Sequence, residues 1–298
     1  MKRQLTRPIL VTIALAFAIA CSPQKTEEPR RSSLKSLIET ERDFSKLSAD
    51  HGMKVAFLRY LDDEAILFRP HPVNGIQYTS LREDSGVQLS WEPTRAGVAD
   101  SHDYGWTTGP YRVAPQQEGE PPLYGYFVSL WKRQKTDRWK VLMDLGTVNP
   151  ADQPCPEEAD LTPRPESGER HTPIVAEALL ELEKGLSERI PAEGAAAVYG
   201  TVQGEETRLY RDDRCPAVDA AGIEQLLLAL PGRPSWEPIE ATASAAGDLA
   251  YSYGSYRVTE RGSDNALEEG YYLRIWEAGP TGAVLRLEIT SPIPTESE

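Results

Sequence analysis

Carboxyl side chains occupy the same place near the end of each half of this sequence. Asp144 lies in the aliphatic and aromatic segment 138–146, and Glu288 takes the corresponding place in the second half after a one-residue shift. Strand alternation predicts that Lys140 and Leu142 share the side of Asp144. A carboxyl in an apolar pocket has a raised pKa and can serve as a general base, so Asp144 is a candidate catalytic residue. The alternative is a solvated or salt-bridged carboxylate on an exposed sheet face.

Aromatic residues alternate along two segments that precede Asp144. Facing inward, they would form an aromatic pocket with hydroxyl donors, suited to a sugar, a steroid-like ring or a peptide. Cross-strand packing alone is the alternative explanation. The predicted ligand-binding residues of the first half are Tyr104, Trp106, Thr108, Tyr124, Tyr126 and Asp144. Those of the second half are Tyr251, Tyr253, Tyr271 and Glu288. The two linings differ, which argues against one catalytic set shared by both halves.

His71 is a second catalytic candidate, because it follows a predicted strand at 65–68. The second half has Asp213 at that place, and a lone loop histidine is ordinarily solvated. The remaining histidines lack zinc-ligand spacing, and 62–64 lacks the periodic donors of a calcium loop, so we predict a turn there. The chain has neither a phosphate-binding glycine loop nor a Gly-x-Ser-x-Gly elbow. We therefore expect neither a metal nor a cofactor.

An internal repeat positions these residues. Trp91-Glu92-Pro93 returns as Trp236-Glu237-Pro238, and further identities follow at the same offset of 145 residues. They pair Gly109, Tyr111-Arg112-Val113 and Trp131 with Gly254, Tyr256-Arg257-Val258 and Trp276. The earlier part aligns at an offset of 142, which pairs Phe44, Gly52 and Phe68-Arg69 with Leu186, Gly194 and Tyr210-Arg211. A period this long indicates two copies of a domain.

Each copy has a predicted order of helices followed by strands. The first has helices at 33–48, 53–61 and 78–88 and strands at 65–68, 89–99, 104–113, 124–135 and 138–146. Thr172-Pro173 predicts an N-cap with proline at the first helical position of the second copy. That copy continues through 195–202, a strand at 207–211, a helix at 219–230 and strands to 290. The predicted domains are 33–147 and 172–292, with a proline-rich linker at 148–171 and a tail at 293–298.

The order helix, helix, strand, helix and four strands is similar to the nuclear transport factor 2-like cone of the SnoaL-like and ketosteroid-isomerase-like families. The strings DYGWTTGPY (103–111), YFVSLWKR (126–133) and RWKVLMD (138–144) resemble the exported branch of that superfamily. The resemblance implies an α+β fold of two tandem cones, each a strongly bent antiparallel sheet curled around a long N-terminal helix. It also implies an apolar cavity in each cone and pairing of the two domains sheet to sheet as an intramolecular pseudo-dimer.

The N-terminus has the features of an export signal. Lys2, Arg3 and Arg7 precede the apolar run 9–20, which is too short to span a bilayer as a helix. The run ends in Ala18-Ile19-Ala20-Cys21, which resembles the lipobox of bacterial lipoproteins; an ordinary secretory signal is the alternative. The resemblance implies cleavage of 1–20, acylation of Cys21, a flexible tether at 21–32 and an outer-membrane location facing the periplasm.

Charge and cysteine content narrow the classes of partner. The formal net charge of −14 argues against nucleic-acid binding, because the phosphate backbone is also negatively charged. In an exported protein Cys155 and Cys215 can form one disulfide between the linker and the second domain; two separate thiols are the alternative.

Three hypotheses of function follow. The first is a lipid-anchored, non-catalytic envelope protein that binds a small molecule, a peptide or another envelope protein. The second is an enzyme of the isomerase or cyclase type with Asp144 as base and Tyr104 or Tyr126 as donor. The third is a structural scaffold, because this fold serves all three roles.

Overall fold

The structure is a computed structural model that describes residues 24–84, 87–114, 121–149, 155, 158–163 and 171–294, with the backbone alone for 24–28. The predicted signal peptide and Cys21 lie outside the described residues. Within the described part, no helix is long and apolar enough to cross a membrane.

The described residues of the first domain form three helices and seven strands. They are α1 (Gln24–His51), α2 (Met53–Tyr60), β1 (Leu61–Phe68), β2 (Pro72–Asn74), α3 (Gly75–Leu81), β3 (Gln88–Trp91), β4 (Arg95–Val98), β5 (Tyr104–Ala114), β6 (Leu123–Arg133) and β7 (Trp139–Val148). The sheet order is β2-β1-β7-β6-β5-β3, with β4 also paired to β5. All pairs are antiparallel except β1 and β7, which run parallel.

The second domain repeats this plan with a simpler sheet. Its elements are α4 (Ala176–Glu193), α5 (Ala195–Gly200), β8 (Gln203–Tyr210), α6 (Ala220–Leu228), β9 (Arg233–Ala243), β10 (Leu249–Thr259), β11 (Ala266–Gly279) and β12 (Gly282–Pro292). The order is β8-β12-β11-β10-β9, and β8 runs parallel to β12. The predicted antiparallel sheets therefore each hold one parallel pair.

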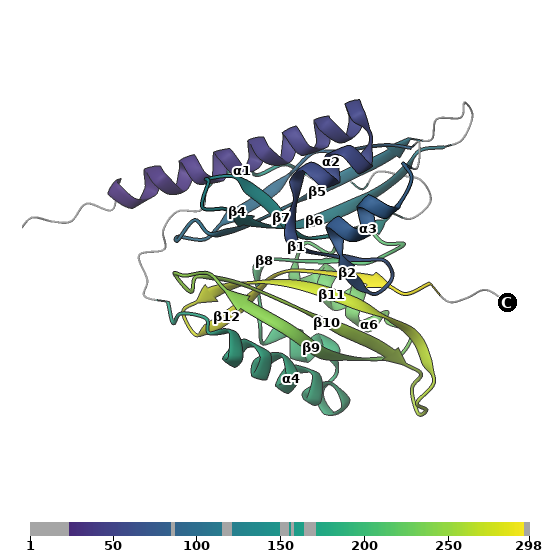
Figure 1. The fold of residues 1–298 in the computed structure, drawn as a ribbon. Coiled ribbons are helices and arrows are strands. Elements are labelled where there is room, and N and C mark those ends of the chain that lie inside the picture. The colour runs from purple at the N-terminus through teal and green to yellow at the C-terminus, as the bar shows by residue number, and fades with distance from the viewer. Residues whose placement is uncertain are drawn as a thin grey trace, which may run out of the picture.

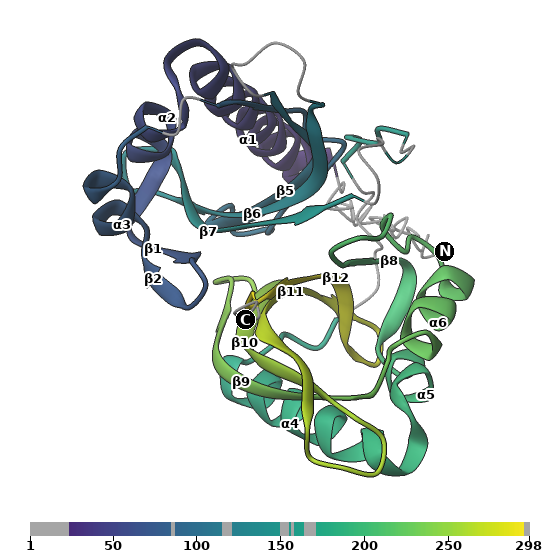
Figure 2. The same cartoon turned by 90° about the vertical axis from the view of Figure 1, so that its right-hand side faces the viewer.

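Each sheet curls around its own long helix, which confirms the predicted α+β architecture (Figures 1 and 2). The helices present their apolar stripes to the sheets: Leu34, Leu37, Ile38 and Phe44 are buried in α1, and Leu179, Leu186 and Ile190 in α4. Each stripe also carries one buried carboxyl, Glu41 in α1 and Glu183 in α4. Gly52 and Gly194 join the first two helices of each domain with positive φ angles of 89° and 85°, a conformation that favours glycine.

The outer faces of the two sheets pack against each other, so the layers run helix, sheet, sheet, helix (Figure 1). One apolar cluster spans the boundary between the domains and joins aromatic residues of both sheets. Polar contacts hold its margin: the backbone N–H of Asp100 donates to the Asp248 carboxylate at 2.8 Å, and that of Ala245 to the Asp103 carboxylate at 2.8 Å. The interface is therefore an apolar centre with hydrogen bonds along its edge.

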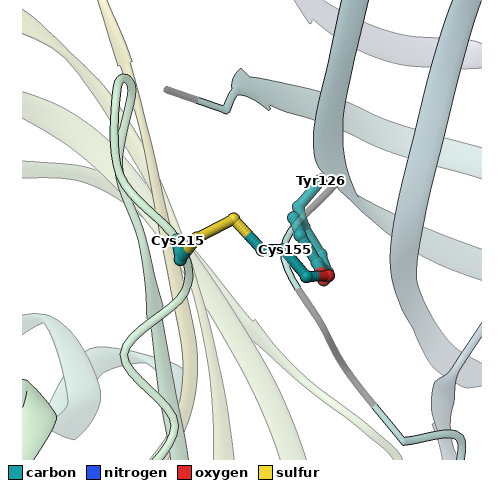
Figure 3. Close-up of a disulfide and its surroundings, with 3 residues drawn as sticks. All are labelled: Tyr126, Cys155 and Cys215. Atoms are coloured by element: carbon teal, nitrogen blue, oxygen red, sulfur yellow. A yellow bond between two sulfur atoms is a disulfide. The ribbon is translucent and has the colours of Figure 1, made fainter. Parts of the chain in front are cut away.

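A disulfide joins Cys155, in the linker, to Cys215 of the second domain (Figure 3). Beside it the Tyr126 hydroxyl donates to the Cys155 carbonyl oxygen at 2.8 Å. The end of β7 is fixed to the same loop, because Val148 N–H donates to the Asp212 carboxylate and the Val148 carbonyl accepts from Asp213 N–H, both at 2.9 Å. The linker is thus attached to both domains at this point.

Several predicted boundaries were wrong. The predicted tether is helical from Gln24 onward, because extending a nucleated helix costs little and Arg30 pairs with Asp100 at 3.2 Å. Thr172 does not cap α4: Ile174 N–H donates to the Gly247 carbonyl at 2.8 Å, which holds that segment extended until Val175.

The turn predicted at 62–64 belongs to β1, and the third helix begins earlier than predicted. Asn74 is the N-cap of α3, and its side chain accepts from Gln77 N–H at 2.9 Å. Its capping bond determines where the helix starts.

Candidate functional site

The aromatic residues predicted to line a pocket inside the first cone lie instead on the outer face of its sheet. Tyr104 and Trp106 belong to the interdomain cluster, and the Tyr104 ring lies 5.9 Å from that of Tyr251. Tyr126 belongs to the same cluster, with its ring 5.8 Å from that of Tyr210. The expected orientation was therefore wrong. These side chains face the second domain, which covers the outer side of the sheet.

The other predicted pocket residues on these strands follow the same alternation. The Thr108 hydroxyl is buried and donates to the Phe127 carbonyl oxygen. Tyr124 is half-buried and, two residues from Tyr126 on β6, lies on the face toward the second domain. Neither is among the residues that line the cavity beside Asp144.

The predicted second-domain aromatics and His71 also meet at the interface. Tyr251 and Tyr253 are buried in the interdomain cluster, and Tyr271 packs against it. His71 is exposed, and its Nδ1 lies 3.0 Å from the Tyr271 hydroxyl. The candidate base His71 therefore contacts the second domain instead of the interior of the first cone.

A cavity of about 230 Å³ lies inside the first cone, between α2 and the concave face of the sheet. It is lined by Met53, Phe57, Arg69, Leu89, Trp91, Tyr111, Val113, Phe127, Asp144, Leu145 and Gly146. Most of these side chains are apolar, and the polar ones are Arg69, Tyr111 and Asp144. Arg69 is exposed, so its guanidinium marks the mouth of the cavity.

Asp144 reaches this cavity because of a bulge in β7. Leu130 pairs with Met143 while Trp131 pairs with Val141, so Leu142 is the extra residue. Leu142 therefore joins the interdomain cluster, and Asp144 faces the cone interior, contrary to the alternation predicted from the sequence.

The environment of Asp144 keeps part of its population protonated near neutral pH. Burial raises its pKa to about 6, and the hydrogen bond from Ser129 and the charge of Arg69 oppose this shift. Ser129 Oγ donates to the Asp144 carboxylate at 2.9 Å. This carboxyl is half-buried, because it faces the cavity instead of a packed side chain.

A second carboxyl, Glu41 of α1, contacts Trp91, which lines the cavity. It accepts hydrogen bonds from Trp91 Nε1 at 2.5 Å, from Trp131 Nε1 at 3.0 Å and from the Thr107 hydroxyl. Burial raises its pKa to about 7; these hydrogen bonds oppose the shift and the charge of Asp144 adds to it. Its acceptor atoms are occupied by the protein.

Tyr111 supplies a phenol to the cavity wall. Burial raises its pKa to about 12, with a further contribution from Asp212 of the second domain, so the hydroxyl stays protonated. It can therefore donate a hydrogen bond to a ligand.

The second cone holds a buried ion-pair network in the corresponding place. Glu288 is fully buried and pairs with Arg274, at 2.6 Å between Oε2 and Nε, and with Arg211. Arg274 also pairs with Glu183, at 3.2 Å, and the Tyr199 hydroxyl donates to Glu288 at 2.6 Å. Burial alone would raise the pKa of Glu288, but the two arginines lower it to about 2.

One position separates the two cones. At the repeat offsets, Arg69 corresponds to Arg211, but Ser129 corresponds to Arg274. Asp144 corresponds to Glu288 after the one-residue shift. The Arg274 side chain occupies the interior of the second cone, and the void beside it measures only about 10 Å³, room for one water at most. The first cone remains open because serine stands where the second cone has arginine.

Sequence reasoning found Asp144 but missed Arg69, Ser129 and Tyr111. The available signal was the comparison of the two copies: Arg69 and Tyr111 recur at aligned positions, and Ser129 is a small residue opposite an arginine. Reading the repeat for differences, as well as for identities, would have found the position that leaves one cone open.

No family model matches this chain, and no curated protein matches it. Similar folds occur among solved structures. An NTF2-like protein with a cystatin-like fold from Novosphingobium aromaticivorans is 17% identical, covers 41% of this chain and 83% of its own, and has a TM-score of 0.34. A ketosteroid isomerase-like protein from Erwinia carotovora atroseptica is 17% identical over 40% of this chain and 92% of its own, with a TM-score of 0.30.

Proposed function

We propose that this chain is a non-catalytic binding protein whose first cone holds a small molecule and whose second cone is a closed, structural copy. The observation that carries this proposal is the open cavity beside Asp144, set against the filled cone around Glu288. A partly desolvated carboxyl with a phenol and a guanidinium at the rim offers both polar and apolar contacts to a ligand.

The cavity limits the size of the ligand. Its volume of about 230 Å³ is below the roughly 300–1,000 Å³ of clefts that hold drug-sized molecules. We therefore expect a ligand with one ring, or a short chain, whose polar end meets Asp144 and Tyr111.

A variant that copies the second cone tests this proposal. Ser129→Arg should place a guanidinium beside Asp144 and fill the cavity, whereas Ser129→Ala should leave it open. The full-length chain and both variants would be titrated with phenol, indole, benzoate and benzamide by isothermal titration calorimetry. We expect at least one probe to bind the wild type and Ser129→Ala but not Ser129→Arg. Equal binding by all three proteins would refute the proposal.

A second candidate, proton-transfer catalysis, is favoured by one observation. Asp144, whose pKa burial raises to about 6, shares its cavity with the protonated phenol of Tyr111. A carboxylate base and a phenol donor are the groups needed to move a proton next to a carbonyl. Tyr104 and Tyr126, the donors expected from the sequence, lie on the other sheet face. Conversion of a one-ring β,γ-unsaturated ketone to its conjugated isomer, lost in Asp144→Asn, would support this candidate; no conversion by the wild type would remove it.

Anchoring in the cell envelope is part of the same proposal and rests on the N-terminal sequence. Lys2, Arg3 and the apolar run before Cys21 support export, lipid attachment and an outer-membrane location facing the periplasm. Metabolic labelling with a fatty acid in a bacterial host tests it: the wild type should incorporate label and Cys21→Ala should not. Label in neither protein would refute lipid attachment.

A further inference from the structure

In the second cone, a guanidinium group occupies the interior of the fold. The Arg274 guanidinium lies between two carboxylates, Glu288 at 2.6 Å and Glu183 at 3.2 Å. The side chain is almost completely buried. An organic cation of this shape is therefore compatible with the interior of the fold when carboxylates face it.

Aromatic rings complete the surroundings of that guanidinium. Its central carbon lies 4.4 Å from the ring centroid of Tyr272, 4.9 Å from that of Trp236 and 5.8 Å from that of Tyr199. These distances are within the range of cation–π attraction, which is strongest when the cation is desolvated. Arg274 is therefore held by aromatic rings as well as by charge.

The first cone has an equivalent for each of these rings. At the repeat offsets, Phe127, Trp91 and Phe57 stand at the positions of Tyr272, Trp236 and Tyr199. All three line the open cavity together with Asp144. The aromatic surround of the arginine is retained although the arginine itself is replaced by Ser129.

The carboxyl that faces this empty place is Asp144. Glu41, the counterpart of Glu183, already accepts from Trp91 Nε1 at 2.5 Å, which supplies a donor within the protein. Asp144 accepts from Ser129 at 2.9 Å through Oδ2, and the residue lines the cavity. An incoming cation would meet Asp144 first.

The arginine at the mouth does not conflict with a second cation. In the second cone Arg211, the counterpart of Arg69, pairs with Glu288 while Arg274 pairs with the same carboxylate. One carboxylate of this fold thus accommodates two guanidinium groups at once.

We propose, building on the binding function proposed above, that the ligand of the first cone is a small organic cation with a planar amidinium or guanidinium head. This head takes the place that Arg274 occupies in the second cone, against Asp144 and between the rings of Trp91, Phe127 and Phe57. The remainder of the ligand extends past Tyr111 toward the mouth.

The affinity for the cation should depend on pH, because Asp144 ionises. The charged and titratable groups around it are Glu41 of α1, Arg69 after β1 and Tyr111 of β5. Burial raises the pKa of Asp144 to about 6, so the carboxylate form that attracts a cation increases above that pH. A neutral ligand of the same shape gains nothing from this ionisation.

Benzamidinium and benzamide form a matched pair for the test, because they share shape and differ in charge. Isothermal titration calorimetry would compare both probes on the full-length wild type, Asp144→Asn and Ser129→Arg. We expect benzamidinium to bind the wild type about tenfold or more tightly than benzamide at about pH 7.5, with a smaller ratio at about pH 5. Asp144→Asn, which keeps the side-chain shape, should abolish the preference, and Ser129→Arg should abolish binding of the cation.

The outcomes separate this inference from the function on which it rests. If benzamide binds as tightly as benzamidinium, and Ser129→Arg blocks both, the cavity is a binding site but the cation inference is overturned. A preference for benzamidinium that survives in Asp144→Asn also overturns it. If benzamidinium fails to bind the wild type, the cation inference is wrong, while the four-probe titration decides separately whether the cavity binds anything. Should Ser129→Arg fail to fold, Asp144→Asn alone decides.

Discussion

Removing the charge of Asp144 and of Glu288 should change stability in opposite directions, although the two carboxyls hold equivalent places. Asp144 has a raised pKa, near 6, because burial disfavours its charge, whereas the pKa of Glu288 is lowered to about 2 by Arg274 and Arg211. The substitutions Asp144→Asn and Glu288→Gln keep size and shape and remove the charge.

The size of the first effect follows from proton linkage. The folded chain holds the Asp144 proton between the ordinary pKa of 3.8 and about 6, where the unfolded chain has already released it. Stability therefore falls as pH rises through this window, by at most about 3 kcal/mol at roughly 1.4 kcal/mol per unit of pKa. Asp144→Asn should be more stable than the wild type at about pH 7.5, by up to about 3 kcal/mol, and equal to it at about pH 4.

Glu288→Gln should be destabilising at neutral pH. The pKa of this carboxyl is lowered, so its contribution to stability is complete above the ordinary value of 4.5 and is lost as pH falls toward 2. Removing its charge leaves Arg274 and Arg211 buried without their shared partner, which costs about 3–5 kcal/mol. Urea unfolding at the two pH values, followed by tryptophan fluorescence, measures both variants. A destabilised Asp144→Asn at neutral pH, or a difference from the wild type that persists at about pH 4, would refute the argument.

Four further substitutions test the packing of the two domains. Replacing Cys215 by serine breaks its bond to Cys155 across a sequence separation of 60 residues, and should lower the free energy of unfolding by about 4 kcal/mol under non-reducing conditions; equal melting temperatures would contradict this. Gly109→Ala would bring its Cβ onto a backbone carbonyl oxygen and should lower the free energy of unfolding by about 1–3 kcal/mol. Gly185→Ala, in open space within α4, should instead be stabilising by about 0.5–1 kcal/mol. Thermal unfolding compares the two variants. Trp106→Ala should cost about 3–5 kcal/mol, because this side chain is buried between the domains; a loss below about 1 kcal/mol in urea unfolding would show that the sheets are not packed as described.

The order of elements was predictable because the repeat and the strand alternation are local signals. Trp91-Glu92-Pro93 and its second copy fixed the domain period, and turn residues separated the strands of each sheet. Boundaries failed where a distant partner decides the conformation. The contact of Ile174 with Gly247, for example, delays the start of α4, and no local pattern reports it.

The orientation of the strands could not be read from the sequence. Alternation separates Tyr104, Trp106 and Thr108 from the neighbouring odd-numbered residues, but it does not say which set lies inside a cone. In a sheet with one solvated face, polar residues would mark the outside. Here the outside of the sheet packs against another domain, so the more aromatic face was the buried interface.

The bulge at Leu142 is a second, independent reason why the inward-facing residues could not be predicted from the sequence. It moves Asp144 to the inner face, while Met143 beside it belongs to the apolar cluster that faces the second domain. The second domain has the same irregularity at Arg286, between the pairs of Ile275 and Trp276. Two copies that share a bulge at the same place look regular when aligned, so the comparison of the copies cannot show it.

The contrast between the two cones argues that the first is kept open for a ligand. A buried ion pair such as that of Glu288 and Arg274 contributes little net stability, since desolvation offsets the attraction. Asp144 is less favourable still, because its charge is buried without an arginine in the place of Ser129 and its raised pKa lowers stability at neutral pH. An amide or an apolar side chain would remove this cost without altering the fold. A local feature that lowers stability and faces a cavity is typical of a functional site. A purely structural copy would therefore be filled, as the cone around Arg274 is. The loss of stability caused by the buried charge of Asp144 is explained when a bound cation supplies the missing partner.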